Sequence, residues 1–368
     1  MTSSSIYDSR VQALQKEMTA NGVDLVAIAP SANNVYLTGF KPFGDERPCV
    51  LFITPTSKAY IVPELNADQV EAHTDYKVIR WKDADGPQAA FKQALAGLGE
   101  TNAACLAVDN TMRSDFLLLV HELTKPEKMI PANDLISPLR LCKSAEEVAL
   151  MKTSARLADE ALLAGVEACR PGVSEKDVAD TIGSYFRRHG ADEVSFVLVA
   201  SGPNGAFPHH EVSNRVLQAG DVVILDIGAS LDNYQSDITR VVSLGEPSEE
   251  VLKVYNVVRA ANEAGRKAAR AGALAKDVDL AARDVITKAG YGLNYLHRTG
   301  HGIGLEVHEG PWITSTSETV LKPGMAFSVE PGIYLQDRFG IRIEDIVVAT
   351  DGECNRLTGL PHDLYIKK

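Results

Sequence analysis

Hydrophobic and polar positions alternate differently along the N-terminal third of the chain and along the remainder. Near the N-terminus, apolar residues at helical spacing predict a helix over residues 8–21, capped by Asp8 and ended by Gly22. Five apolar runs then predict short strands, and the segments between them predict helices. The strands are expected at residues 25–29, 50–53, 59–62, 78–81 and 104–108, and the helices near 66–73, 86–98 and 114–124. This alternation is typical of an α/β domain.

A boundary follows this first domain. The segment 132–139 carries turn residues, and Ser144 with Glu147 three positions later forms a capping box that opens a new helix. A length of 368 residues suits two domains better than one. We therefore expect domains at residues 1–135 and 136–368.

The stretch at residues 221–240, DVVILDIGASLDNYQSDITR, predicts two strands of a hairpin. Asp226 and Asp237 fall within strand-like sequence, where a buried carboxylate needs a cation or a donor. Two carboxylates that face each other repel, and a shared metal ion removes the repulsion. The alternative is that Asp226 caps the loop and Asp237 pairs with Arg240.

Three histidines gather further along, at His297, His301 and His308, out of nine in the chain. Glycines alternate with other residues around His301 and permit backbone conformations closed to other residues. We expect His301 to be a metal ligand on an irregular loop.

Two more carboxylates stand in strand-like sequence beyond these histidines. Glu330 ends an apolar run directly before Pro331, where the chain must turn. Arg342 and Glu344 share one face of a strand predicted at residues 340–348. The alternative for this last pair is an ordinary surface salt bridge.

Together these segments supply four carboxylates and one imidazole: Asp226, Asp237, His301, Glu330 and Glu344. A donor set rich in oxygen suits Mn²⁺ or another hard to borderline divalent ion. Five ligands are too many for one ion, so we expect two ions bridged by carboxylates, with a hydroxide held between them.

The order of the motifs DIG…SDITR, GHGIGLEVHE, VEPGIY and GIRIEDI resembles the pita-bread metallopeptidases. The branch is that of Xaa-Pro dipeptidase (prolidase) and Xaa-Pro aminopeptidase (aminopeptidase P). The resemblance extends from about residue 139 to the C-terminus and is looser before it. It implies an α+β fold with a C-terminal pita-bread (creatinase/aminopeptidase-like) domain, a smaller N-terminal α/β creatinase-like domain, and a homodimer.

The same resemblance implies a role for each candidate residue. Asp226 would bind one ion, His301 and Glu330 the other, and Asp237 and Glu344 both. The residues implied in catalysis are His209, His308, Glu330 and Arg342, and those implied in substrate binding are His209, His297 and His308. His210, directly after His209, stays open as an alternative to it.

The implied activity is hydrolysis of the bond between an N-terminal residue and proline in a small peptide. The metal is expected to be Mn²⁺, with Co²⁺, Zn²⁺ or Fe²⁺ as alternatives. Dipeptides and longer peptides are equally open as substrates. Two other functions also stay open: a metal-dependent hydrolase or lyase that acts on a small non-peptide amide metabolite, and a non-catalytic binding protein on the same scaffold.

A faint internal repeat runs through the second domain. Five residues recur at an offset of 100: Gly172, Lys176, Asp177, Val178 and Gly190 reappear at 272, 276, 277, 278 and 290. The repeat predicts two related halves, and the pita-bread resemblance implies that they pack with a cleft between them.

Charge and cysteine content limit the remaining function classes. The net charge of −12 argues against a nucleic-acid surface. An odd number of cysteines, five without a CxxC pair, fits a reducing compartment. The N-terminal MTSSSIYDSR has no export-signal pattern, and no apolar run is long enough to span a membrane. We expect a cytoplasmic protein without a membrane or nucleic-acid partner.

Overall fold

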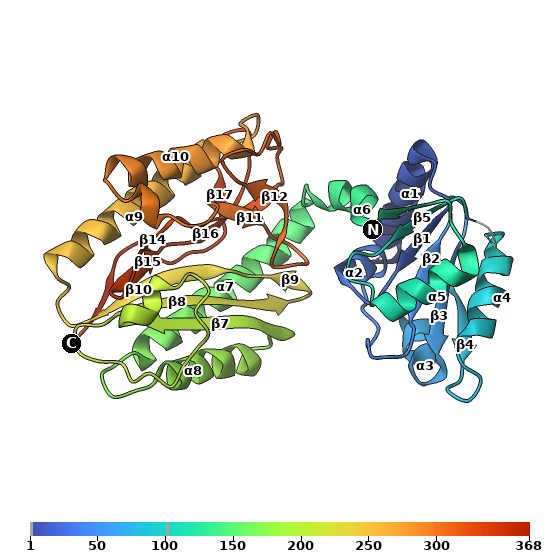
Figure 1. Cartoon of the computed structure of the whole chain (residues 1–368), viewed down its shortest axis with the longest axis horizontal. Coiled ribbons are helices and arrows are strands. Elements are labelled where there is room, and N and C mark those ends of the chain that lie inside the picture. Colours follow the sequence, from blue (N-terminus) through green and yellow to red (C-terminus); the bar gives the residue numbers. More distant parts are fainter. Residues whose placement is uncertain (1–2, 101–102) are drawn as a thin grey trace. The chain divides into compact units, whose positions relative to one another are not determined.

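The computed structural model describes residues 3–100 and 103–368. The first two residues of the stretch in which we expected no export signal lie outside the described residues. The chain forms two compact units, Met1–Arg140 and Leu141–Lys368 (Figure 1). The boundary predicted at 135/136 falls inside helix α6 (Asn133–Arg140), whose residues group with the first unit.

The N-terminal unit is built on a six-stranded mixed sheet with the strand order β4-β3-β2-β1-β5-β6. Strands β1 and β2 are buried along their whole length, so both faces of the sheet centre are covered. In chain order the elements are α1 (Ser3–Asn21), β1 (Leu25–Ile28), α2 (Ala32–Thr38), β2 (Val50–Ile53), β3 (Lys58–Pro63), α3 (Glu64–His73), β4 (Lys77–Trp81), α4 (Gln88–Leu98), β5 (Cys105–Val108), α5 (Ser114–Thr124), β6 (Lys128–Pro131) and α6.

The first predicted helix differs from the structure at its start. Helix α1 begins at Ser3, so Asp8 lies inside it and does not cap it. The Asp8 carboxylate instead accepts a hydrogen bond from Lys58 Nζ at 3.1 Å. Helix α2 and strand β6 were not predicted. The Ser31 side chain caps α2 by accepting from the backbone N–H groups of Asn33 and Asn34.

The C-terminal unit contains two five-stranded sheets and a two-stranded one, with four long helices against them (Figure 1). The strand orders are β18-β10-β8-β7, with β9 paired to β8, then β12-β11-β13-β16-β17, and β14-β15. The elements are α7 (Ala145–Ala168), α8 (Glu175–Arg188), β7 (Glu193–Ser201), η1 (Gly202–Ala206), β8 (Val222–Leu231), β9 (Tyr234–Gln235), β10 (Ile238–Leu244), α9 (Glu249–Ala268), α10 (Ala275–Lys288), η2 (Gly292–Asn294), β11 (Gly300–Gly302), β12 (Glu309–Ile313), β13 (Ala326–Val329), β14 (Gly332–Leu335), β15 (Phe339–Arg342), β16 (Asp345–Val348), β17 (Asn355–Arg356) and β18 (Tyr365–Lys367).

The two halves of this unit repeat the same local geometry. Helices α8 and α10 each follow a glycine with positive φ, 92° at Gly172 and 84° at Gly272. The Gly172 N–H donates to the carbonyl of Leu217 and the Gly272 N–H to that of Leu321, both at 2.9 Å. The faint repeat in the sequence therefore corresponds to a repeated helix entry.

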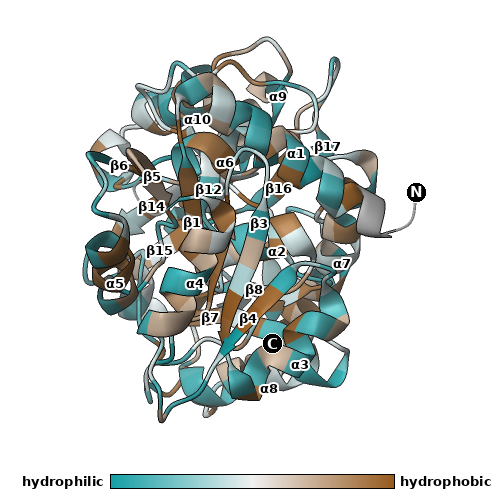
Figure 2. Cartoon of the chain, turned by 90° about the vertical axis from the view of Figure 1, so that its right-hand side faces the viewer, coloured by the Kyte–Doolittle hydropathy of each residue, from teal (hydrophilic) through white to brown (hydrophobic). Residues whose placement is uncertain are grey.

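Hydrophobic packing separates the strands from solvent. Helices α7 and α8 pack on β7, β8 and β10, and α9 and α10 pack on β13 and β16. Figure 2 shows hydrophobic residues along central strands such as β1 and hydrophilic residues on exposed helices such as α3.

All five cysteines are free thiols. Among the described residues, no helix combines the length and the apolar character that crossing a bilayer requires.

Candidate metal centre

The two aspartates of the hairpin lie on one face of neighbouring strands. Asp226 lies within β8, and Asp237 directly precedes β10, the antiparallel partner of β8. The register places Thr239 opposite Asp226, so Asp237 is the diagonal neighbour of Asp226 on the same face. The alternative partner Arg240 is engaged elsewhere, because its Nη2 donates to Asp345 Oδ1 at 2.9 Å.

His301 lies in strand β11, and not on the irregular loop that we expected. Neither Gly300 nor Gly302 has a positive φ. A Cβ atom at Gly300 would collide with the carbonyl group of Ser328, and one at Gly302 with that of Gly310. The glycines therefore provide space for close strand approach, which brings His301 toward β13.

Glu330 and Glu344 meet because their strands pair. Glu330 follows β13 and Glu344 precedes β16, and these strands are antiparallel with Val329 opposite Asp345. The Glu330 N–H donates to the carbonyl oxygen of Thr299 at 2.8 Å. The strand predicted at residues 340–348 is interrupted at Ile343 and Glu344, where the chain passes from β15 to β16.

These elements bring four of the five predicted ligands together, whereas the fifth, Asp226, contacts Arg342. Asp237, His301 and Glu344 are buried, and each places one ligand atom within 4.8 Å of the other two. His301 Nε2 is 3.7 Å from Asp237 Oδ2 and 3.3 Å from Glu330 Oε1. The arrangement concentrates carboxylate oxygens around one imidazole.

The electrostatics of this cluster fit a bound cation. Three buried oxygens of this cluster have no hydrogen-bond partner among the described residues, namely Asp226 Oδ1, Asp237 Oδ1 and Glu344 Oε1. Burial raises the pKa of Asp237 and of Glu344 well above the ordinary value, and neighbouring carboxylates raise both further. Burial also raises the pKa of Glu330 to about 7. Because such oxygens are costly without a partner, the donor set suits divalent ions.

The His301 imidazole is in the protonation state that a metal ligand requires. Burial lowers its pKa to about 3, and the neighbouring His308 lowers it further. The two rings meet edge to face, with their centroids 4.2 Å apart. His301 is therefore neutral at physiological pH, with a ring nitrogen available for a cation.

Arg342 connects Asp226 to a tyrosine and a histidine. Its Nη2 donates to Asp226 Oδ2, its Nε to Thr239 Oγ1 at 3.3 Å, and its Nη1 to Tyr334 Oη at 2.7 Å. Tyr334 Oη lies 2.8 Å from His297 Nε2. Burial, with the Arg342 charge added, lowers the pKa of His297 to about 4. The alternative of a surface salt bridge between Arg342 and its strand neighbour is wrong, because the guanidinium is buried and pairs across strands.

The remaining histidines differ in their surroundings. His210 Nε2 lies 2.9 Å from Glu175 Oε2 and is engaged there. His209 is exposed. Burial lowers the pKa of His308, and the neighbouring Arg298 lowers it further. Of the two adjacent histidines, His210 is engaged by a carboxylate and His209 is the exposed one.

Two hydroxyl groups that the sequence analysis missed hold the carboxylates. Thr239 Oγ1 donates to Glu344 Oε2 at 2.7 Å, and Ser328 Oγ donates to Glu330 Oε1 at 3.1 Å. Thr239 is two residues after Asp237, and Ser328 is two before Glu330. Spacing by two along an extended chain is the signal that would have placed them on the ligand face.

Arg298 was also missed, although it lies in the same motif as His301. Its guanidinium lies 4.6 Å above the ring of Trp312, which is 44% exposed. Among the described residues no carboxylate forms an ion pair with it, and its charge contributes, after burial, to the lowered pKa of His308. It is therefore a cation beside the site, and within the described part of the chain its guanidinium contacts the Trp312 ring.

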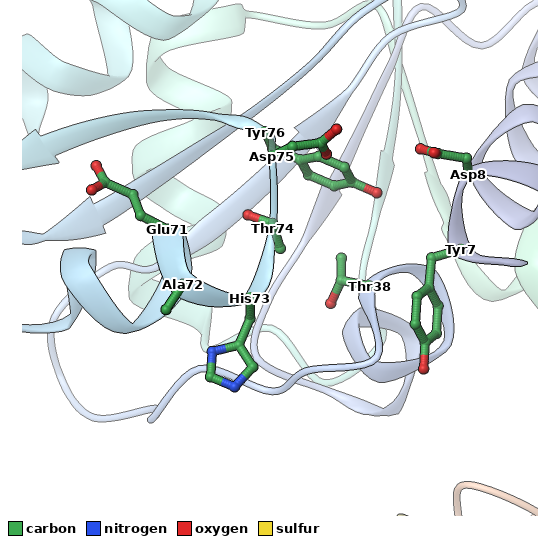
Figure 3. Close-up of a pocket in the computed structure, with 9 residues that line it drawn as sticks. All are labelled: Tyr7, Asp8, Thr38, Glu71, Ala72, His73, Thr74, Asp75 and Tyr76. Atoms are coloured by element: carbon green, nitrogen blue, oxygen red, sulfur yellow. The ribbon is translucent and has the colours of Figure 1, made fainter. Parts of the chain in front are cut away.

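The N-terminal unit has a cavity of its own, of about 340 Å³ (Figure 3). It lies between α1 and the segment from Glu71 to Tyr76. Figure 3 shows the Glu71 and His73 side chains pointing away from Asp8. Within the described part of the chain, the one group of three or more side chains placed to hold a metal ion is in the C-terminal unit.

Comparison with known proteins places these observations in a family. Residues 149–351 match metallopeptidase family M24, and residues 10–142 match the Creatinase/Prolidase N-terminal domain. An Xaa-Pro dipeptidase of Pyrococcus furiosus is 33% identical over 356 residues, covering 96% of this chain and 99% of that protein.

Solved structures agree with this assignment. A recombinant prolidase from Thermococcus sibiricus has a TM-score of 0.93 at 38% identity and covers 98% of this chain and 99% of that one. An X-Pro aminopeptidase from Thermotoga maritima has a TM-score of 0.83 at 34% identity, with 95% and 99% covered. The predicted α+β fold class is confirmed. The chain therefore belongs to metallopeptidase family M24, as a pita-bread member of the prolidase branch that carries a Creatinase/Prolidase N-terminal domain.

Proposed function

We propose that this protein is a metal-dependent peptidase that cleaves the bond between an N-terminal residue and proline, with dipeptides as its substrates. The observation that carries the proposal is the buried cluster of Asp237, His301 and Glu344, with its unpartnered carboxylate oxygens. Relatives along nearly the whole chain that bear the name Xaa-Pro dipeptidase support the substrate class.

The proposed metal site holds two divalent ions. Asp226 would hold one ion, His301 and Glu330 would hold the other, and Asp237 and Glu344 would serve both. Mn²⁺ is the proposed metal because four of the five ligands offer oxygen, with Co²⁺, Zn²⁺ and Fe²⁺ as its competitors. When bound, the ions lower the pKa of water toward neutrality and polarise the scissile carbonyl group.

The other residues bind the substrate and handle its protons. Glu330 keeps part of its side chain accessible, so it can pass a proton toward the proline nitrogen. His209 and His308 donate to the oxygen that becomes negatively charged in the transition state. His297, neutral and held by Tyr334, lines the substrate side and positions Arg342 through that hydroxyl.

Arg298 favours dipeptides over longer peptides. In an Xaa-Pro dipeptide the carboxylate follows the proline directly, so a cation close to the scissile bond can bind it. Arg298 is such a cation, stacked on Trp312 and free of a carboxylate partner among the described residues. The structural neighbour named X-Pro aminopeptidase keeps longer peptides as the second candidate.

We also propose a homodimer in a reducing, cytoplasmic compartment. The dimer is supported by the family resemblance, and the compartment by five free thiols. Analytical ultracentrifugation at several protein concentrations tests the dimer, and a single species of monomer mass throughout contradicts it.

The test of activity compares Ala-Pro, Ala-Pro-Ala and Ala-Ala as substrates of metal-stripped protein and of protein with Mn²⁺ restored. We expect Mn²⁺ to restore cleavage of Ala-Pro, with Ala-Pro-Ala slower and Ala-Ala uncut. Faster cleavage of Ala-Pro-Ala makes the protein an aminopeptidase. Cleavage of none of the three with any of the four metals contradicts the peptidase proposal and directs the search to small amides or to binding without catalysis.

A further inference from the structure

Helix α8 begins with a fully buried carboxylate that binds six donors. Glu175 Oε1 accepts from the Ser201 N–H at 2.8 Å, from Ser201 Oγ at 2.6 Å and from Asn204 Nδ2 at 2.9 Å. Glu175 Oε2 accepts from the Ser213 N–H at 3.1 Å and from Ser213 Oγ at 2.7 Å, and lies 2.9 Å from His210 Nε2. All of these donors belong to one segment of 13 residues, 201–213.

This segment carries His209 but has little structure of its own. After η1 it forms no regular element up to Ser213, and its tip exposes both Phe207 and His209. The ends of the segment and the neighbour of His209 are held by the single carboxylate of Glu175. The position of His209 therefore depends on a group that does not itself reach the metal ligands.

The second half of the unit uses the same device. On α10, which repeats α8, the buried Asp279 accepts from the N–H of Thr299 at 2.9 Å and from its Oγ1 at 2.8 Å. Thr299 lies two residues before His301, and its carbonyl accepts from the Glu330 N–H at 2.8 Å. Each helix thus fixes one histidine segment, but only the segment held by Asp279 contains a metal ligand.

We propose that Glu175 is a positioning residue for His209, which it holds in place for the transition state without contacting substrate or metal. The kinetic consequence rests on the proposed peptidase function, whereas the structural consequence does not. Because His209 acts on the developing negative charge, displacing it should lower kcat more than it changes KM.

Glu175→Gln is the informative substitution because it preserves shape. A glutamine side chain offers one oxygen and one NH₂ group, and the NH₂ group must face the backbone N–H of Ser201 or of Ser213. Two donors then confront each other and one end of the segment is released. Asp177→Asn is the matched control, because Asp177 caps the same helix through Ser174, is exposed, and forms no hydrogen bond to residues 201–213 among the described contacts.

The first test measures hydrogen–deuterium exchange. We expect Glu175→Gln to increase exchange across residues 202–213 and to leave residues 300–309 unchanged, with Asp177→Asn like the wild type. If Glu175→Gln does not fold, Ser213→Ala removes one donor from the same carboxylate and is expected to act in the same direction more weakly. Wild-type exchange at 202–213 in the folded variant overturns the proposal, whatever the protein's activity.

The second test is a kinetic double-mutant cycle with Ala-Pro. We expect Glu175→Gln to lower kcat by about 10- to 100-fold, with little change in KM. Calorimetric titration with Mn²⁺ is expected to show wild-type affinity. Combined with His209→Gln, Glu175→Gln should add little further loss, because both act through one side chain. Fully additive losses, or weakened Mn²⁺ binding, overturn the positioning role. If the wild type does not cleave Ala-Pro, the proposed function fails and the exchange experiment still decides the positioning.

Discussion

Two buried aspartates show how partners, and not burial, decide the state of a carboxylate. Burial alone would raise the pKa of Asp345, but His362 and Arg240 bind this carboxylate and hold its pKa well below the usual range. Asp237 is as deeply buried, and burial together with Glu344 raises its pKa. At the scale of single residues, the carboxylate with an oxygen that has no hydrogen-bond partner among the described residues is therefore the one available to a metal ion.

Asp237→Asn separates function from stability. We expect a loss of at least about 100-fold in kcat/KM for Ala-Pro, because a metal ligand is replaced by a neutral amide. The same change removes repulsion among the buried carboxylates, so the Tm of the metal-free protein should not fall. Assays with excess Mn²⁺ and thermal unfolding measure both effects. Near-normal turnover would contradict the bridging role of Asp237.

Arg298→Gln tests whether a single positive charge sets the preference for dipeptides. We expect KM for Ala-Pro to rise about 10- to 100-fold, the usual effect of losing a charge-assisted hydrogen bond. Ala-Pro amide lacks the carboxylate and serves as the control substrate, with KM unchanged by the substitution. Equal effects on both substrates would show that Arg298 does not bind the carboxylate.

At the scale of elements, strand pairing creates the site. Strands β13 and β16 place Glu330 and Glu344 at one end of a ladder, and the register of β8 and β10 aligns Asp226 with Thr239. Helix α10 also supports the site, because its buried Asp279 carboxylate binds the segment before His301. Helix and strand periodicity predicted most of these elements and the hairpin of β8 and β10, but not the pairing of β13 with β16.

Asp279→Asn tests the contribution of α10. The substitution weakens the hydrogen bonds that Thr299 donates to Asp279, and it therefore disturbs the placement of His301 and Glu330. We expect Mn²⁺ affinity to fall by about 10- to 100-fold. Calorimetric titration measures the affinity directly. Asp284→Asn is the control on the same helix, because Asp284 is exposed and pairs only with Lys288 among the described contacts. Unchanged Mn²⁺ affinity in Asp279→Asn contradicts the supporting role of α10.

At the scale of the whole molecule, metal binding and folding are linked. The folded-state pKa of Glu330 is raised from 4.5 to about 7 in the absence of a cation. A carboxylate with a raised pKa contributes stability that is fully present below its unfolded value and is lost as pH rises through the folded value. The metal-free protein therefore loses this contribution between pH 4.5 and about 7, where bound metal would replace the proton.

Thermal unfolding with and without Mn²⁺ checks this linkage. We expect the increase in Tm caused by Mn²⁺ to be small at pH 5 and larger at pH 8, because protons no longer compete for the carboxylates. At a free Mn²⁺ concentration of 100 times Kd, each bound ion adds about 2.7 kcal/mol to the free energy of unfolding. Glu330→Gln removes the titrating carboxylate and serves as the comparison. A Tm increase that is the same at both pH values in the wild type would contradict the linkage.

The sequence by itself determined the local elements and the chemical types of the ligands, because periodicity and caps are encoded within a few neighbouring residues. The capping box of Ser144 and Glu147 and the strand that holds Asp226 are examples. Only the tertiary structure decided the partners. Arg342 binds Asp226 and not its strand neighbour Glu344, and it does so across 116 positions of sequence. Spacing along a chain specifies a face, but which distant side chain meets that face depends on strand register and packing, which no local pattern contains.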